Sequence, residues 1–195
     1  MANIDAAFGL RPIAKVGSAP GGTTGTTKYS IADNQGTAIF TGDPVKYKSD
    51  GTVEVATAGD PSCGVFMGCF YTDPTTSKPT FRNHFPASLS PGDAIAFVAD
   101  DPDQLFIAQQ DSDGSNIVAA DLNLNADLVF GAGSTSTGMS GVEIDSSSKN
   151  TTAALQVRLI DFYDTPSNDA TANNSTLVVK INNHQLGSHT GTLGV

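Results

Sequence analysis

Hydrophobic and polar residues alternate in short runs along most of the chain, a pattern that is typical of half-buried β-strands. Val53 and Val55 alternate with polar neighbours just after an Asp50-Gly51 pair, which predicts a hairpin. The segment 62–73 is almost continuously apolar, as expected of a strand that is buried on both faces. We therefore predict an all-β fold without helices, a compact β-barrel or β-sandwich of about eight to ten short strands.

Two stretches share one pattern, which predicts a weak internal repeat of a β-hairpin. Each begins with Gly-Asp, continues through an alternating strand and an acidic turn, and ends a second strand with alanine. The first spans residues 42–56 and the second spans 92–108. Such a repeat fits a two-lobed sandwich or a closed barrel.

The two ends of the chain lack this alternation. Residues 17–27 contain only Gly, Ser, Ala, Pro and Thr, which predicts a flexible tether. The last nine residues are polar and glycine-rich and are predicted to form an exposed arm. We thus expect an N-terminal arm and flexible tether (1–27), a β-rich body (28–186) and a C-terminal tail (187–195), with both ends extended.

Composition supports the all-β prediction and narrows the class of partner. Of the 20 acidic residues 18 are aspartate, and the chain has 20 glycines and 10 prolines, which favours turns. The net charge of −10 argues against nucleic-acid binding, because such an interface needs a basic stripe. The charge is uneven, since residues 1–28 carry a net +2 and the remainder carries −12.

Cys63 and Cys69 are six residues apart, which fits neither a zinc pair nor a redox pair. We predict two reduced thiols in the core, as in a protein made inside a cell. The N-terminus lacks the apolar run of a signal peptide. No stretch approaches the ~20 apolar residues needed to cross a bilayer, so we expect no membrane partner.

Several residues resemble parts of reactive sites without completing one. Residues 111–121 begin like a calcium loop, but Gly114 follows Asp113 at once, and Leu122 stands where the last acidic ligand belongs. A solvated Asp-Gly turn is the better interpretation.

His84, His184 and His189 lack the spacing of a zinc protease. Ser140 resembles a nucleophile elbow, but it lies in a Gly/Ser/Thr stretch, 131–141, that we predict to be a surface loop. We therefore predict no enzyme activity, no catalytic residue, no cofactor and no metal.

Aromatic residues between positions 66 and 85 allow two interpretations, a sugar-stacking platform or, more often, a core. They are Phe66, Phe70, Tyr71, Phe81 and Phe85. The last two lie in the segment 78–89, which we predict to be a loop with an aromatic side.

Three strings resemble structural proteins encoded in the head modules of tailed bacteriophages. They are MANIDAAFGLRPIAKVGSAPGG at the start, GVFMGCFYTDPTTSKPTFRNHFP in the middle and VVKINNHQL near the end. The resemblance implies a virion component of the capsid decoration (cement) type. Proteins in that role are mostly small β-rich bodies, often trimers at three-fold and quasi-three-fold positions, and they commonly send a terminal arm onto neighbouring capsid subunits.

This role implies that the chain binds the major capsid protein and itself, as a homotrimer on the outer capsid surface, after synthesis in the host cytoplasm. The apolar and basic lead then becomes a partner-binding arm, in which Phe8, Leu10 and Ile13 supply apolar burial and Arg11 donates hydrogen bonds. Phe8 and Arg11 are the strongest candidates, because aromatic and arginine side chains dominate interfaces. Two alternatives stay open: another virion part (tail-tube, head-fibre or minor head protein), or a carbohydrate-binding or hydrolytic β domain.

Overall fold

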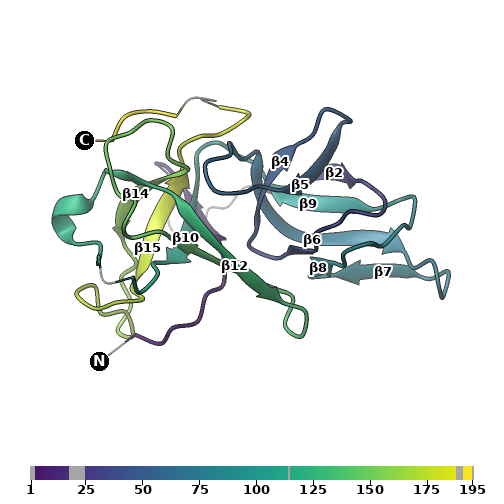
Figure 1. Cartoon of the computed structure of the whole chain (residues 1–195), viewed down its shortest axis with the longest axis horizontal. Helices are drawn as coiled ribbons and strands as arrows, with labels where there is room; N and C mark the ends of the chain where they lie inside the picture. Colours follow the sequence, from purple (N-terminus) through teal and green to yellow (C-terminus); the bar gives the residue numbers. More distant parts are fainter. Residues whose placement is uncertain (1–2, 18–24, 114, 188–190, 195) are drawn as a thin grey trace.

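The computed structural model describes residues 3–17, 25–113, 115–187 and 191–194. In this part of the chain the fold is all-β, as predicted, and helical geometry is confined to one 3-10 turn, η1 (Ala119–Asp121). No helix of the described part has the length and apolarity needed to cross a membrane. The strands form two lobes side by side along the longest axis (Figure 1). We call residues 25–100 the barrel and the remaining described residues the sheet lobe.

Five strands close the barrel through their backbone hydrogen bonds. Around the barrel they are β4 (Pro44–Tyr47), β5 (Thr52–Val55), β2 (Thr27–Ile31), β9 (Ile95–Ala99) and β6 (Gly64–Thr72), which pairs again with β4. Strands β2 and β5 are parallel, and the other neighbours are antiparallel. Side chains such as Val45, Val53, Phe66 and Val98 fill the interior.

Three short strands flank the barrel. They are β7 (Pro79–Arg82), which extends β6 on the outside, and the pair β3 (Ile39–Phe40) and β8 (His84–Phe85). Ile39 and Phe85 belong to the barrel core. The predicted loop over 78–89 is therefore wrong in part, because this segment carries two strands.

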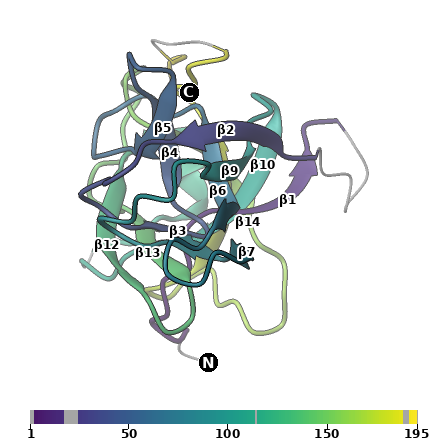
Figure 2. The same ribbon diagram turned by 90° about the vertical axis from the view of Figure 1, so that its right-hand side faces the viewer.

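The sheet lobe is an open five-stranded sheet covered by a hairpin. Across the sheet the strands are β1 (Arg11–Lys15), β10 (Gln104–Gln109), β15 (Thr176–Ile181), β14 (Val157–Phe162) and β11 (Asn125–Ala126). The hairpin consists of β12 (Leu128–Ser134) and β13 (Met139–Ile144), which lie on the opposite side of the molecule from β1 (Figure 2). The predicted surface loop over 131–141 is wrong, because this Gly/Ser/Thr stretch pairs with itself as two strands.

The two hairpins predicted from the repeat have different outcomes. The segment 42–56 forms the antiparallel pair β4–β5, as predicted. The segment 92–108 contains β9 and β10, but β9 belongs to the barrel and β10 to the open sheet. Its acidic turn carries the chain from one lobe to the other, so the prediction of a second hairpin is wrong.

The lobes are joined by a junction in which both cores take part. Val65 on β6 and Ala99 on β9 are register partners, and both pack into the core of the sheet lobe. Ser62 exchanges backbone hydrogen bonds with Asn183 and Gln185. The barrel and the sheet lobe therefore form one body.

Candidate functional site

The N-terminal segment, which we expected to be an arm, is part of the folded body. Leu10 is only 1% exposed and lies in the core of the sheet lobe. Residues 11–15 form β1, which pairs with β10 along the sheet edge. The expected body boundary at residue 28 and the expected role of Leu10 as a partner anchor are thus corrected, because this apolar segment buries itself against its own sheet. The stretch 18–24 of the predicted tether lies outside the described residues.

Gly9 fixes the place where this segment passes between the lobes. Its amide donates to the carbonyl of Val142, and the next amide, that of Leu10, donates to the carbonyl of Gly42. Gly9 has a φ of +71°, and a Cβ atom there would lie 2.4 Å from the Gly42 carbonyl oxygen. Only glycine meets both conditions, which explains the Phe-Gly-Leu order at this point.

Phe8, Arg11 and Ile13 remain at the surface. The Arg11 guanidinium lies 4.9 Å from the centre of the Phe8 ring, a cation–π contact, and Ile13 is half-buried. Phe8 and Arg11 line a surface groove of about 320 Å³ together with Ile107 and Tyr163. We call it the N-terminal groove. It brings together the two residues that the sequence marked as the strongest candidates.

The groove continues into a strongly exposed apolar side chain. Ile4 lies at its rim and is 81% exposed. The Ile4 carbonyl accepts a hydrogen bond from the buried Gln109 side chain, and Asn3 exchanges hydrogen bonds with Asp169. The backbone that presents Ile4 is thereby held on the sheet lobe.

The C-terminal tail is also packed, at least where it is described. The carbonyl of Thr192 accepts hydrogen bonds from Asn125 and Arg158, and the amide of Gly194 donates to Thr151. The expectation of a free arm is therefore wrong for residues 191–194, although Thr192 and Leu193 are exposed as expected. Residues 188–190, and with them His189, lie outside the described part.

The aromatic residues are divided between the barrel core and the surface. Phe66, Tyr71 and Phe85 are buried, whereas Phe70 is 37% exposed and Phe81 is 61% exposed. Phe70 and Phe81 are register partners on β6 and β7. Their outward neighbours on β9 are Ile95, opposite Phe70, and Phe97, opposite Gly68. We call Phe70, Phe81, Ile95 and Phe97 the aromatic patch.

Charge is divided unequally between the lobes. The sheet lobe contains twelve acidic and five basic residues, a net of −7, and the barrel contains eight and five, a net of −3. Five lysines form ion pairs with carboxylates, namely Lys15, Lys46, Lys48, Lys149 and Lys180. Among the described residues, the other five basic side chains have no carboxylate within ion-pair distance, namely Arg11, Lys28, Lys78, Arg82 and Arg158. Arg158 donates to Asn125 and to the Thr192 carbonyl, Arg11 lies in the N-terminal groove, and the other three lie on the barrel.

The calcium-like loop gains a third carboxylate from a distant part of the chain. One oxygen each of Asp111, Asp113 and Asp145 lies within 4.8 Å of the others. The Ser146 hydroxyl contacts the first two at 2.5 and 2.8 Å, and hydrogen bonds from Ser146 and Ser115 keep the pKa of Asp113 below its ordinary value. These contacts are those of a hydrogen-bonded surface turn, and we assign no metal to it.

Of the candidate catalytic residues that the structure describes, Ser140 and His184 are buried and His84 is half-buried. Ser140 is buried at the junction beside Asp43, whose pKa is raised by burial although Ser140 and the Phe40 amide donate to it. His84 stacks on Phe40, and burial lowers its pKa. His184 is buried, and its Nδ1 accepts from the Leu186 amide.

A cavity of about 530 Å³ opens between the lobes. It is lined by residues 32–38, by β5 and by β12, among others. Gln35 is 8% exposed, and its Oε1 has no hydrogen-bond partner within the described structure. The lining brings no nucleophile and base together, so we assign no chemistry to this cavity.

Both cysteines are buried in the barrel core as free thiols, as predicted. Burial raises the pKa of each thiol to about 12. These thiols are packing residues.

The sequence marks two members of the aromatic patch, Phe70 and Phe81, in a set that it assigns to a stacking platform or, more often, to the core, and it misses Ile95 and Phe97. The segment that contains Phe81 is predicted as a loop, so its pairing with β6 is not foreseen. No protein family, curated protein or solved structure matches this chain at a significant level.

Proposed function

We propose that this chain is a virion structural protein that decorates and stabilises a tailed-phage capsid by binding the lattice of the major capsid protein, as a trimer at three-fold and quasi-three-fold positions. The observation that carries the proposal is the N-terminal groove. It offers an exposed Ile4, a half-buried Phe8 and an exposed Arg11 without a carboxylate partner among the described residues, on a lobe whose net charge is −7. An apolar and cationic surface of this kind suits an acidic protein partner.

The resemblance to phage head proteins supports the proposal, and its three strings have a shared place in the fold. The first contributes Leu10 to the sheet-lobe core, the second contributes Val65 to the same core, and the third contributes Asn183, whose carbonyl accepts from Ser62. All three strings thus build the junction that makes the two lobes one body. A stiff body suits a protein that has to resist outward pressure on a shell.

Repeated contacts on a symmetric lattice also support this role. A decoration protein makes the same modest contact many times on a symmetric lattice, so that avidity replaces single-site affinity. The proposal needs neither catalysis nor a cofactor, and it places the acidic body on the outer capsid surface.

The experiment mixes purified protein with undecorated capsids and measures occupancy against concentration. Removing residues 1–16 is a poor test, because it also removes Leu10 and β1. We instead use Arg11→Glu alone and combined with Phe8→Ala, and we expect at least ~30-fold weaker binding for the pair, the effect of a hot spot of about 2 kcal/mol.

Lys78→Glu is the matched control, because it makes the same charge change on an exposed barrel turn and should leave occupancy unchanged. Equal binding by wild type and both groove variants would remove the groove from the contact. Wild-type protein that binds no capsid, or that labels tails in images of the virion, would overturn the decoration role in favour of another virion part.

The exposed pair Phe70 and Phe81 is the observation that favours the carbohydrate-binding alternative, because exposed aromatic rings can stack on sugars. A glycan array distinguishes the two functions. Glycan binding that is lost in Phe81→Ala, together with no capsid binding, would replace our proposal.

A further inference from the structure

We propose that the aromatic patch is a self-association surface, and that it binds the acidic sheet lobe of a second copy of this chain in a head-to-tail contact. The inference deepens the proposed function and rests on it only for the expectation that copies of the chain assemble. It is tested on the isolated protein, without capsids.

The patch is a continuous outer surface of three neighbouring strands. Phe81 on β7, Phe70 on β6 and Ile95 on β9 are register partners across the sheet. In the next row Phe97 stands opposite Gly68, and the Phe81 ring lies over this glycine, within 3.1 Å of where a Cβ atom would be. Absence of a side chain at position 68 thus lets Phe81 and Phe97 approach, with ring centres 5.7 Å apart.

The aromatic patch is preorganised within the single chain. Its rings pack on each other and on a closed barrel, so binding does not have to order a loop. Contiguous exposed apolar residues on a soluble body mark interaction sites. Within the described structure β7 has β6 as its sole strand partner, so the patch ends at a strand edge with unpaired backbone groups.

The charge around the patch selects the partner surface. Lys28 on β2 is the register partner of Phe97, and it has no carboxylate partner within the described residues. In a symmetric contact of patch with patch, this lysine would meet its own copy or other uncompensated cations of the barrel, and like charges repel. The sheet lobe, with its net charge of −7, is the complementary surface.

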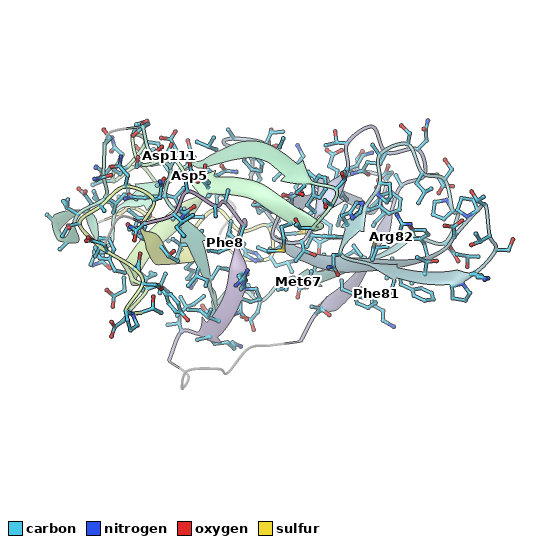
Figure 3. All side chains as sticks on the ribbon, turned by 90° about the horizontal axis from the view of Figure 1, so that it is seen from below. Asp5, Phe8, Met67, Phe81, Arg82 and Asp111 are labelled. Atoms are coloured by element: carbon cyan, nitrogen blue, oxygen red, sulfur yellow. The ribbon has the colours of Figure 1, made fainter. Side chains whose placement is uncertain are left out.

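The two surfaces lie on different halves of the molecule. Figure 3 shows Phe81 on the barrel half of the long axis and Asp111 on the sheet-lobe half. Asp111, Asp113 and Asp145 form a group of carboxylates that no described lysine or arginine neutralises through an ion pair. A contact between unlike surfaces is heterologous, and such contacts form rings when the rotation closes, which accommodates a trimer.

The test uses two variants that each remove one half of the contact. The patch variant carries Phe81→Ser and Lys28→Glu, and the carboxylate variant carries Asp111→Asn, Asp113→Asn and Asp145→Asn. Phe81 is largely exposed, so its replacement opens no core cavity. Val118→Ser, which removes another exposed apolar side chain, is the matched control. Sedimentation velocity gives the assembly state, and urea unfolding verifies that each variant is folded.

We expect wild type and the control to form an oligomer that weakens with salt, and each of the two variants to associate at least ~30-fold more weakly. A mixture of the two variants should form a heterodimer, because one retains the patch and the other retains the carboxylates. Absence of that heterodimer would overturn the head-to-tail contact. A monomeric wild type at high protein concentration, or variants that assemble like wild type, would overturn the inference as a whole. Capsid binding by a monomeric wild type would leave the proposed function standing.

Discussion

The barrel and the sheet lobe differ in how the backbone groups at their strand edges are paired. The barrel closes on itself, since β6 pairs with β9 on one side and with β4 on the other. Its interior is apolar and aromatic, and its five barrel strands come from one continuous stretch of chain. Closure pairs the backbone of these strands mainly with one another, and side chains serve at strand ends, where Gln185 accepts from the Tyr47 amide and Asp93 accepts from the Thr72 amide.

The sheet lobe stays open and draws on side-chain amides instead. Seven buried amides donate hydrogen bonds to main-chain carbonyls, namely Gln104, Gln109, Gln110, Asn125, Gln156, Asn182 and Asn183. The bonded carbonyls belong largely to the N-terminal segment, to loops and to the C-terminal tail. An open sheet assembled from both ends of the chain thus relies on buried side-chain amides, whereas the barrel relies mainly on pairing between its strands.

The largest expected loss of stability is at Gln156, which joins the two lobes. This side chain donates to the carbonyls of Thr57 and Asp60 in the barrel and accepts from the amide of Leu128 in the sheet lobe. Gln156→Leu leaves the buried Leu128 amide and the half-buried Asp60 carbonyl without this partner, whereas the Thr57 carbonyl keeps the amide of Asp60. We therefore expect a loss of about 2–5 kcal/mol in the free energy of unfolding. Gln35→Leu is the matched change on the barrel side, where Oε1 has no partner, and it should cost less than about 1 kcal/mol. Urea unfolding measures both, and equal costs would contradict the comparison.

A second prediction tests how firmly the lobes are joined. Gly9→Ala places a Cβ atom against the Gly42 carbonyl in a left-handed conformation, and we expect a loss of about 2–4 kcal/mol. Gly17 has a similar φ of +78° with nothing within 4 Å of its virtual Cβ, so Gly17→Ala should cost only about 1 kcal/mol. If the two variants unfold at the same urea concentration, the close contact at Gly9 is not important for stability.

A third prediction concerns pH and lies in the sheet lobe. Burial, with smaller contributions from Asp5 and Asp111, raises the pKa of Glu143 to about 7. Its contribution to stability is therefore full below the unfolded pKa of ~4.3 and falls as pH rises towards 7. We expect Glu143→Gln to reduce the loss of unfolding free energy between pH 5 and pH 8 by about 1–2 kcal/mol, after allowance for solvent screening. Parallel pH profiles for wild type and variant would refute this.

The last and smallest expected effect is specific to the barrel and concerns the reactivity of its two thiols. With a pKa of about 12, Cys63 and Cys69 carry roughly a thousandth of the thiolate of an ordinary cysteine at pH 8. An aromatic disulfide reagent should label them only as the barrel opens. Gly9→Ala should speed labelling if the lobes open together, because Val65 and Ala99 tie the cores. Fast labelling of native wild type would contradict the buried positions of both thiols.

The sequence was sufficient for the fold class and for part of the site. Alternation at Val53 and Val55 and the Asp50-Gly51 turn placed the β4–β5 hairpin correctly, because its contacts are local. Phe8 and Arg11 were identified as surface residues of interest, and the structure brings them into one groove. The segment 92–108 has the same pattern as 42–56, yet its two strands belong to different lobes. The alternation of apolar and polar residues predicts a strand but does not determine which other strand it pairs with.

Phe66 and Phe70 show most directly what the sequence could not determine. Four residues apart on one strand, they would face the same side of a regular β6. A register shift between Phe66 and Gly68 reverses the alternation, so Phe66 fills the barrel and Phe70 reaches the surface. The aromatic patch exists because of this bulge, and the bulge depends on pairing with β9.

Composition and periodicity by themselves determined that this chain is an acidic, turn-rich β protein with reduced thiols in its core, because those properties follow from the residues and their immediate neighbours. The tertiary structure decided that the apolar lead is a strand and not an arm. Burial of Leu10 in its own sheet lobe stabilises the folded chain without a partner. Strand β10, far along the chain, supplies the sheet edge with which β1 pairs. That choice depends on a contact between distant segments, which local sequence does not encode.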